Sequence, residues 1–229
     1  KVYIKGVQKL LKAPEKFLGR DIDKMAQQAG LDSNRMGIIY QSESQSVLDY
    51  LPPKKYHEEM ISSKVAGSNR AFSFNRATDL MLNFYENYQN WDGISNRPFV
   101  SPIAENAMFY YNYKLIGSTL ENGELINKIQ LIPKRKYDPV YRGYIYIVED
   151  SWRIHSTDFL MTKESNITLI DSLKINQKFI AINQNWMPAS VAFEFNGGVF
   201  GFKFGGYYLG IYTEYNFKPS IAAKSFKEV

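Results

Sequence analysis

The chain lacks cysteine altogether and has only two histidines among its 229 residues. Without cysteine there can be no disulfide, thiolate metal site or cysteine nucleophile, and the redox compartment stays undetermined. No run of about 18 apolar residues occurs, so no membrane-spanning helix is predicted. The chain also has only a small excess of positive charge, because 28 basic residues are nearly balanced by 23 acidic ones, for a net charge of +5. This balance argues against a dedicated nucleic-acid-binding protein.

The two histidines lack the sequence context of a catalytic or metal-binding group. His57 is followed by two glutamates, without the second histidine of a zinc-binding helix. His155 and Asp158 are three residues apart, and on a regular strand such residues point to opposite faces. There is also no Gly-x-Ser-x-Gly nucleophile elbow. We therefore predict no catalytic residue, no metal site and no cofactor. An enzyme whose carboxylates converge from separate strands stays open as an alternative.

Aromatic residues, by contrast, are abundant at 15% of the chain, and they occur in segments of alternating polarity. The clearest segments, 141–149 and 151–160, are joined by an acidic turn. The turn dipeptide Asn122-Gly123 predicts another hairpin. The glycine-rich stretch 197–210 is interpreted as a curved strand pair, because no helix follows it as a phosphate loop would require. Without helical crossovers, these strands form an antiparallel sheet. Further strands are predicted at 2–10, 37–50, 55–65, 113–119, 125–132, 169–182, 186–195 and 199–217.

Three helices are predicted. Asp21 can cap a short helix that ends before Gly30. A longer helix at 75–90 starts at a good N-cap, Asn75, and places one apolar face at Leu80, Met81, Phe84, Tyr85 and Tyr88. Ser101 followed by Pro102 is a standard start signal for a helix at 102–111.

The resulting fold class is α+β: a strongly curved antiparallel sheet of roughly eight to eleven strands, an open half-barrel wrapped around one or two helices. One half-barrel domain is expected at 1–217, followed by a polar C-terminal linker at 218–229. Because the chain begins at Lys1 in a predicted strand, without a methionine, we expect it to be a domain of a longer protein.

Both faces of the predicted strand 141–149 are apolar, so each must be covered by a helix, a ligand or a neighbouring domain. We predict a concavity that binds an apolar or amphipathic ligand, such as an acyl chain, a lipid or a lipoprotein, between sheet and helices. Ile145 and Ile147 are the alternative inward set on this strand. In a second interpretation, the helices fill the concavity and the domain serves as a scaffold or protein-interaction domain. The predicted ligand-binding residues are Phe84, Tyr88, Tyr110, Tyr144, Tyr146 and Trp152.

Two resemblances to known proteins support this interpretation. The layout with Gly37-Ile-Ile-Tyr40, Pro52-Pro-Lys-Lys-Tyr56, a helix, and hairpins ending in Trp186-Met-Pro188 resembles the periplasmic lipoprotein-carrier fold, an open half-barrel closed by helices. The chain more specifically resembles an uncharacterised family of large Gram-negative envelope proteins. The segments that carry this second resemblance are Gly37–Ser44, Glu59–Val65, Ile132–Pro139, Tyr144–Trp152 and Gly201–Gly206.

In that envelope family, a carboxypeptidase-regulatory-like β-sandwich precedes the matching region and an outer-membrane-type barrel follows it. The resemblance therefore implies a periplasmic location, tethered to or part of an outer-membrane protein. It implies the neighbouring domains of that longer protein as partners, and it implies no reaction.

Overall fold

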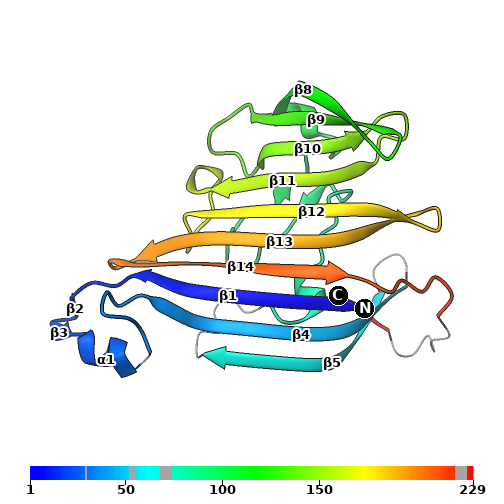
Figure 1. Ribbon diagram of the computed structural model, residues 1–229. Helices are drawn as coiled ribbons and strands as arrows, with labels where there is room; N and C mark the ends of the chain where they lie inside the picture. Colours follow the sequence, from blue (N-terminus) through cyan, green and yellow to red (C-terminus); the bar gives the residue numbers. More distant parts are fainter. Residues whose placement is uncertain (29, 52–54, 68–73, 220–225, 229) are drawn as a thin grey trace.

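The computed structural model describes residues 1–28, 30–51, 55–67, 74–219 and 226–228. One open sheet of eleven antiparallel strands dominates the molecule, in the order β15-β5-β4-β1-β14-β13-β12-β11-β10-β9-β8 (Figure 1). This confirms the predicted antiparallel sheet. Its strands are β1 (Val2–Lys12), β4 (Gly37–Leu51), β5 (Lys55–Gly67), β8 (Tyr111–Glu121), β9 (Glu124–Pro133), β10 (Arg142–Val148), β11 (Ile154–Thr162), β12 (Ser172–Ile182), β13 (Asn185–Val199), β14 (Phe202–Tyr212) and β15 (Lys227–Glu228).

The remaining elements are short. Two separate hairpins are formed by β2 (Lys16–Phe17) with β3 (Arg20–Asp21), and by β6 (Tyr88–Gln89) with β7 (Phe99–Val100). The helical elements are α1 (Asp23–Gln28) and the 3₁₀ turns η1 (Ala77–Leu80), η2 (Ala107–Phe109) and η3 (Lys163–Ser165). Within the described ranges, no helix has the length and apolar character needed to cross a membrane.

The sheet consists of two meanders joined by β14. Strands β1, β4 and β5 form one meander, and β8 to β13 form the other. β14 pairs with β13 on one side and with β1 on the other, where the register runs from Val2 opposite Tyr212 to Lys12 opposite Lys203. The amino group of Lys1 donates a hydrogen bond to the Thr213 carbonyl at 2.6 Å. The first and last long strands of the chain are therefore neighbours.

The glycine-rich stretch forms the β13–β14 hairpin, as predicted. Gly206 is required there, because a Cβ at this position would lie 2.4 Å from the Val7 carbonyl oxygen of the adjacent strand. At the far edge of the first meander, β15 pairs with Tyr56 and Lys55 of β5. The expected linker at 218–229 thus includes a short strand; its residues 220–225 and 229, like Pro52-Pro53 between the predicted strands 37–50 and 55–65, lie outside the described residues.

One face of the sheet, here called the inner face, is covered by residues 74–110, the covering segment (Figure 1). Phe84 of this segment packs on Phe159 of β11 with a ring-centroid distance of 4.8 Å. The Ile154 backbone N–H donates to the Tyr85 hydroxyl at 2.9 Å, and the Gln177 side-chain amide donates to the Leu82 carbonyl at 3.2 Å. Backbone and side-chain contacts together fix this segment to β11 and β12.

The predicted helices at 75–90 and 102–111 are wrong, because the only helical elements of the covering segment are the single 3₁₀ turns η1 and η2. Asparagines offer the backbone an alternative to the helix. The Asn83 side-chain oxygen accepts from the Tyr85 N–H, and the Asn87 oxygen accepts from the Glu105 N–H. Ser101 does accept from the Ile103 N–H, as an N-cap would, but its hydroxyl is committed to the Phe84 carbonyl at 2.5 Å. The short helix before Gly30 is confirmed as α1.

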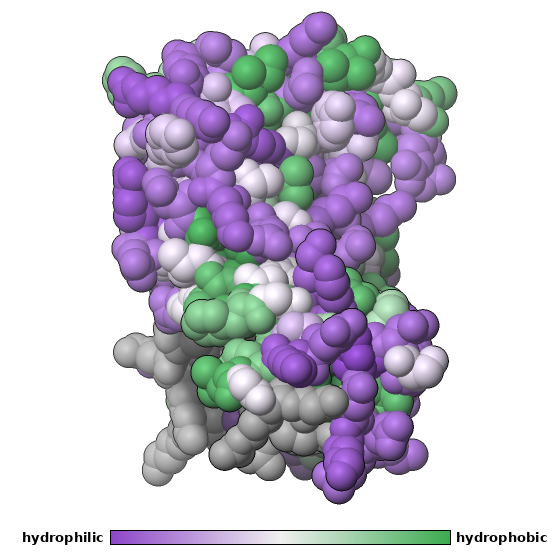
Figure 2. Space-filling model, turned by 90° about the vertical axis from the view of Figure 1, so that its left-hand side faces the viewer, coloured by the Kyte–Doolittle hydropathy of each residue, from purple (hydrophilic) through white to green (hydrophobic). Residues whose placement is uncertain are grey.

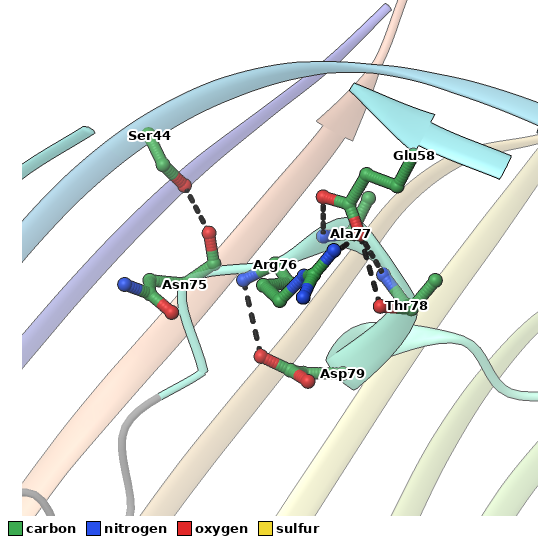
Figure 3. A network of polar contacts seen from close by, with 7 residues as sticks. All are labelled: Ser44, Glu58, Asn75, Arg76, Ala77, Thr78 and Asp79. Carbon is green, nitrogen blue, oxygen red and sulfur yellow. Dashed lines mark hydrogen bonds and ion pairs between the residues drawn. The ribbon is translucent and has the colours of Figure 1, made fainter. Parts of the chain in front are cut away.

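A buried carboxylate anchors the start of the covering segment (Figure 3). Glu58 of β5 accepts hydrogen bonds from the backbone N–H groups of Ala77 and Thr78, at 2.7 and 3.2 Å, and from the Thr78 hydroxyl at 2.9 Å. Burial raises the pKa of Glu58, but the hydrogen bonds donated by Ala77, Ser46 and Thr78 outweigh burial and leave this pKa lowered. Glu58 is therefore held in its charged form as a structural acceptor.

Candidate functional site

The six predicted ligand-binding residues do not converge, so the expected common site is wrong in its geometry. Phe84 is fully buried in the core, between Tyr141 and Phe159. Tyr88, on β6, is exposed, and its hydroxyl accepts from the Asn106 side-chain amide at 2.9 Å. Tyr110 follows η2 and is half-buried. Without the two predicted helices, nothing aligns these three side chains on one face.

On β10 the inward residues are Ile145 and Ile147, both buried in the core cluster. Tyr144 and Tyr146 alternate with them and therefore lie on the opposite face of the sheet, here called the outer face. There the Lys128 ammonium lies over both tyrosine rings, 4.1 Å from the Tyr144 centroid and 5.6 Å from the Tyr146 centroid. The open choice between the two faces is resolved in favour of the isoleucines.

Trp152 lies away from the other five residues. It ends the turn between β10 and β11 with a positive φ of 55°, and its side chain is 69% exposed. A role in ligand binding for any of the six residues stays a prediction, and the structure offers no shared concavity for them.

The space between the sheet and the covering segment is filled by side chains. The hollow found there measures about 10 Å³, which is about the size needed for one water molecule. Its lining is aromatic and aliphatic: Phe74, Trp91, Ile94, Ile170, Leu173, Phe193 and Phe195. This hollow therefore has no room for an acyl chain.

Buried polar groups hold the filled interior together. The Tyr141 hydroxyl accepts from the Trp91 indole N–H at 2.8 Å and donates to the Gln89 side-chain oxygen at 3.2 Å. The Tyr111 hydroxyl donates to the Val100 carbonyl at 2.6 Å and accepts from the Tyr141 N–H at 3.0 Å. Burial raises the pKa of both tyrosines far above the usual range. These hydroxyls therefore serve as neutral structural hydrogen-bonding groups.

A larger hollow, of about 420 Å³, lies on the opposite side from the core, beside Tyr146. We call it the outer groove. Its lining residues lie on β8, β9, β10, β11 and β12. Small residues of β8 leave space on one side of it. At Gly117, an added Cβ would meet nothing within 4 Å. The outer groove is lined by Ile116, Gly117, Ser118, Thr119, Glu121, Ile126, Lys128, Tyr146, His155, Ser156 and Lys178.

Charges of both signs meet in the outer groove. The Glu121 carboxylate lies 3.7 Å from the His155 ring nitrogen and 3.6 Å from the Lys178 ammonium. Burial lowers the pKa of His155, and the nearby Glu121 only partly opposes this effect. His155 is therefore neutral at physiological pH and can accept or donate a hydrogen bond to a ligand.

The sequence interpretation of His155 missed a β-bulge. The pairing of β10 with β11 shifts between Tyr146 and Ile147, opposite His155. His155 consequently lines the same outer face that carries Asp158, although regular alternation predicts opposite faces. Asp158 itself binds Asn176 and Lys174, not His155.

Strand β8 is the open edge of the main sheet. It pairs only with β9 among the described strands, so one row of its backbone N–H and C=O groups has no sheet partner. Its residues from Lys114 to Glu121 are all exposed. Leu115 and Leu120 are 61% and 70% exposed, in an uncharged run that a bulge at 115–117 only locally interrupts. Sequence alternation located this strand but carries no signal of its edge position.

No catalytic constellation accompanies these surfaces in the described part of the chain. His57 contacts Asp49 at 3.2 Å on the first meander, far along the sheet order from His155. Across the described ranges, no group of three or more histidine, aspartate or glutamate side chains is arranged to hold a metal ion.

The sequence of the chain matches one protein family. A family model described as "Family of unknown function (DUF5686)" matches residues 1–215. This match agrees with the resemblance to an uncharacterised family. No curated protein matches the chain.

Solved structures give only distant similarities. A putative outer membrane lipoprotein-sorting protein domain from Vibrio parahaemolyticus is 11% identical, with a TM-score of 0.28, over 97% of this chain and 88% of that chain. LolA superfamily protein NE2245 from Nitrosomonas europaea is 9% identical, with a TM-score of 0.24, over 93% of this chain and 86% of that chain. These matches agree with the resemblance to the lipoprotein-carrier fold. At such TM-scores they carry no argument about binding.

Proposed function

We propose that this chain, which belongs to the family of unknown function DUF5686, is a non-enzymatic interaction domain that binds an extended segment of another protein along β8. The observation that carries the proposal is the open, apolar edge of an otherwise continuous sheet. An extended peptide can add a strand to such an edge through backbone hydrogen bonds. The filled interior supports this function over a carrier with a lumen.

The two edges of the main sheet differ in how they are protected. Edge strands usually carry charges, prolines or covering segments that prevent pairing with other chains. The β5 edge carries charged residues, including Lys55, Glu59 and Lys64, and β15 covers one end of it. In β8, the six residues from Leu115 to Leu120 contain no charge. β8 is therefore the edge suited to binding.

The outer groove supplies the specificity that backbone pairing lacks. Every second side chain of an added strand would point to the outer face, beside Gly117 and Thr119. The groove presents apolar contacts at Ile116 and Ile126, and a cation at Lys128. We infer a partner segment in which apolar and acidic side chains alternate with residues that face the opposite side.

Peptide selection tests this function directly. The immobilised 229-residue chain is used to select from a library of displayed peptides, and binding is measured for the enriched sequences. We expect extended peptides with apolar and acidic residues, whose binding slows hydrogen exchange of the β8 amides. The double variant Leu115→Lys/Leu120→Lys should lose this binding, because charges on an open edge oppose strand addition.

The matched control is Ile61→Lys on β5, which changes an exposed residue near the other edge and should leave peptide binding intact. Peptides that protect a surface other than β8, or that bind the double variant equally well, would contradict the proposal. A fluorescent fatty acid that binds tightly, with loss of binding in interior variants, would instead support the ligand-carrier interpretation.

We further propose that the domain works in the periplasm, within or beside an outer-membrane protein, as the sequence resemblance implies. Neighbouring domains of the longer protein are then the first candidates for the added strand. Cell fractionation of the full-length protein tests the location.

A further inference from the structure

Two tight turns lie at one end of the main sheet, and each places a bulky apolar residue where asparagine is usual. Two-residue hairpin turns with positive φ at both positions favour Asn-Gly. The β8–β9 turn follows this rule, with Asn122 at φ 50° and Gly123 at φ 83°. The β2–β3 turn instead has Leu18 at 51° before Gly19, and the β13–β14 turn has Phe200 at 48° before Gly201.

Neither packing nor backbone preference accounts for these two residues. Leu18 is 86% exposed and Phe200 is 80% exposed, the highest values among the large hydrophobic residues in the described ranges. A bulky residue in the left-handed region is sterically strained, whereas asparagine tolerates it. Strain at an exposed position without compensating burial indicates a role outside the fold itself.

The two turns form one continuous apolar tip. The Phe17 ring lies 6.4 Å from that of Phe200 and 5.3 Å from that of Phe202. A Cβ added at Gly201 would lie 3.5 Å from Pro14, so the connection between β1 and β2 contacts the β13–β14 turn. Figure 2 looks onto this end of the molecule, where hydrophobic residues gather between hydrophilic ones around mid-height.

Lysines lie beside the apolar tip. Lys12 and Lys203 are opposite each other in the β1–β14 register, and Lys16 lies on β2 beside Phe17. All three are exposed, and Lys16 lies opposite Asp21 in the β2–β3 pair. Of the nearby acids, Asp171 is paired with Lys163 and Asp23 with Arg35. Elsewhere in residues 12–21 and 200–203, Arg20 adds a positive charge and Glu15 and Asp21 add two negative ones. Four basic and two acidic residues leave this stretch with a net charge of +2, so the tip is cationic.

We propose that this end of the sheet docks on a bilayer surface that contains anionic lipids. Leu18 and Phe200 enter the boundary between headgroups and acyl chains, while Lys12, Lys16 and Lys203 contact lipid phosphates. Projecting apolar residues next to lysines are a combination that binds anionic membrane interfaces. A protein partner would need a pocket that fits both Leu18 and Phe200 and has acidic residues around it. A bilayer with anionic lipids offers negative charge above an apolar layer at every point of its surface.

Co-sedimentation with vesicles tests the proposal, using the 229-residue chain. Phosphatidylcholine vesicles with added phosphatidylglycerol should bind the protein, and pure phosphatidylcholine should bind it more weakly. The double variant Leu18→Asn/Phe200→Asn should lose about tenfold or more in partitioning, because its apolar anchors are gone. Its thermal midpoint should stay equal or rise, because asparagine suits both turn positions. The triple variant Lys12→Gln/Lys16→Gln/Lys203→Gln should lose the preference for the anionic vesicles.

Trp152→Asn is the matched control, since Trp152 is also exposed with a positive φ but lies at the opposite end of the strands. It should bind vesicles like the unaltered chain. The proposal is overturned if the unaltered chain binds no vesicle, if the Leu18/Phe200 variant binds undiminished, or if Trp152→Asn loses as much binding as that variant.

Discussion

At the scale of single residues, the buried carboxylate of Glu58 fixes the start of the covering segment, where the sequence predicts a helix. Its carboxylate takes up backbone donors that begin the covering segment, at Ala77 and Thr78. Hydrogen bonds to a charged acceptor are roughly twice as strong as those between neutral groups. The interaction ties β5, at one edge of the sheet, to the segment that fills the interior.

Replacing Glu58 by Gln should lower the free energy of unfolding by about 1–3 kcal/mol near neutral pH, because one amide oxygen cannot satisfy the same donors. The folded pKa of Glu58 lies below its ordinary value of 4.5. The stabilisation is therefore complete above pH 4.5 and is lost as the pH falls through the folded pKa. Urea unfolding over this range measures it, and the gap between the two proteins should narrow in acid.

Glu59→Gln is the control for this experiment, because Glu59 is the exposed neighbour on the same strand. Its unfolding free energy should change by no more than about 0.5 kcal/mol. An equal loss in both variants would assign the effect to net charge instead of to the hydrogen bonds.

At the scale of elements, the covering segment packs like a core helix without being one. Phe84 is one of its fully buried aromatic side chains, in edge-to-face contact with Tyr141 at 5.5 Å and Phe159 at 4.8 Å. Phe84→Ala should cost about 3–5 kcal/mol of stability as a large cavity mutation. Met108→Ala, an exposed change in the same segment, should leave the thermal midpoint nearly unchanged. A Phe84→Ala protein as stable as the unaltered chain would contradict this packing.

The sequence predicts the strands well and the covering segment poorly, for a physical reason. Alternation with period two is a local signal, so β10 and β12 are found close to their observed bounds. The helical pattern at 75–90 reflects burial of Leu80 and Phe84, which irregular backbone achieves as well. Helix propensity was the deciding quantity, and the asparagines of this segment oppose it.

The sequence does not predict the candidate site, for similar reasons. Both faces of β10 are apolar, so the sequence could not tell whether Tyr146 or Ile147 points inward. The bulge at His155 and the edge position of β8 depend on pairing between strands, which leaves no local pattern. The pairing of β1 with β14 joins segments about 200 residues apart and is equally invisible locally.

At the scale of the whole molecule, the filled interior should be visible in the ionisation of its tyrosines. Burial raises the pKa of Tyr113 and Tyr208 to about 12, and those of Tyr111 and Tyr141 further. Unfolded tyrosine ionises near pH 10. Above that value the unfolded chain releases protons that the folded chain retains, so stability should fall as the pH rises.

Absorbance titration of phenolate measures this directly. The folded protein should show a fraction of its 17 tyrosines that ionises only together with unfolding, whereas the chain in denaturant should titrate fully near pH 10. Complete titration of the folded protein near pH 10 would show that water reaches the interior.

The position of β14 between the two meanders also sets the order in which the molecule can be made. A chain delivered from its amino terminus presents β1, β4 and β5 early, yet β1 lacks its second neighbour until residues 202–212 have emerged. Throughout that interval the nascent chain exposes an unpaired strand on each meander, in a state prone to aggregation. Closure through such distant contacts is slow. Correct folding therefore requires that β1 stays shielded until β14 arrives, and chaperones that bind the amino-terminal meander would act in that interval.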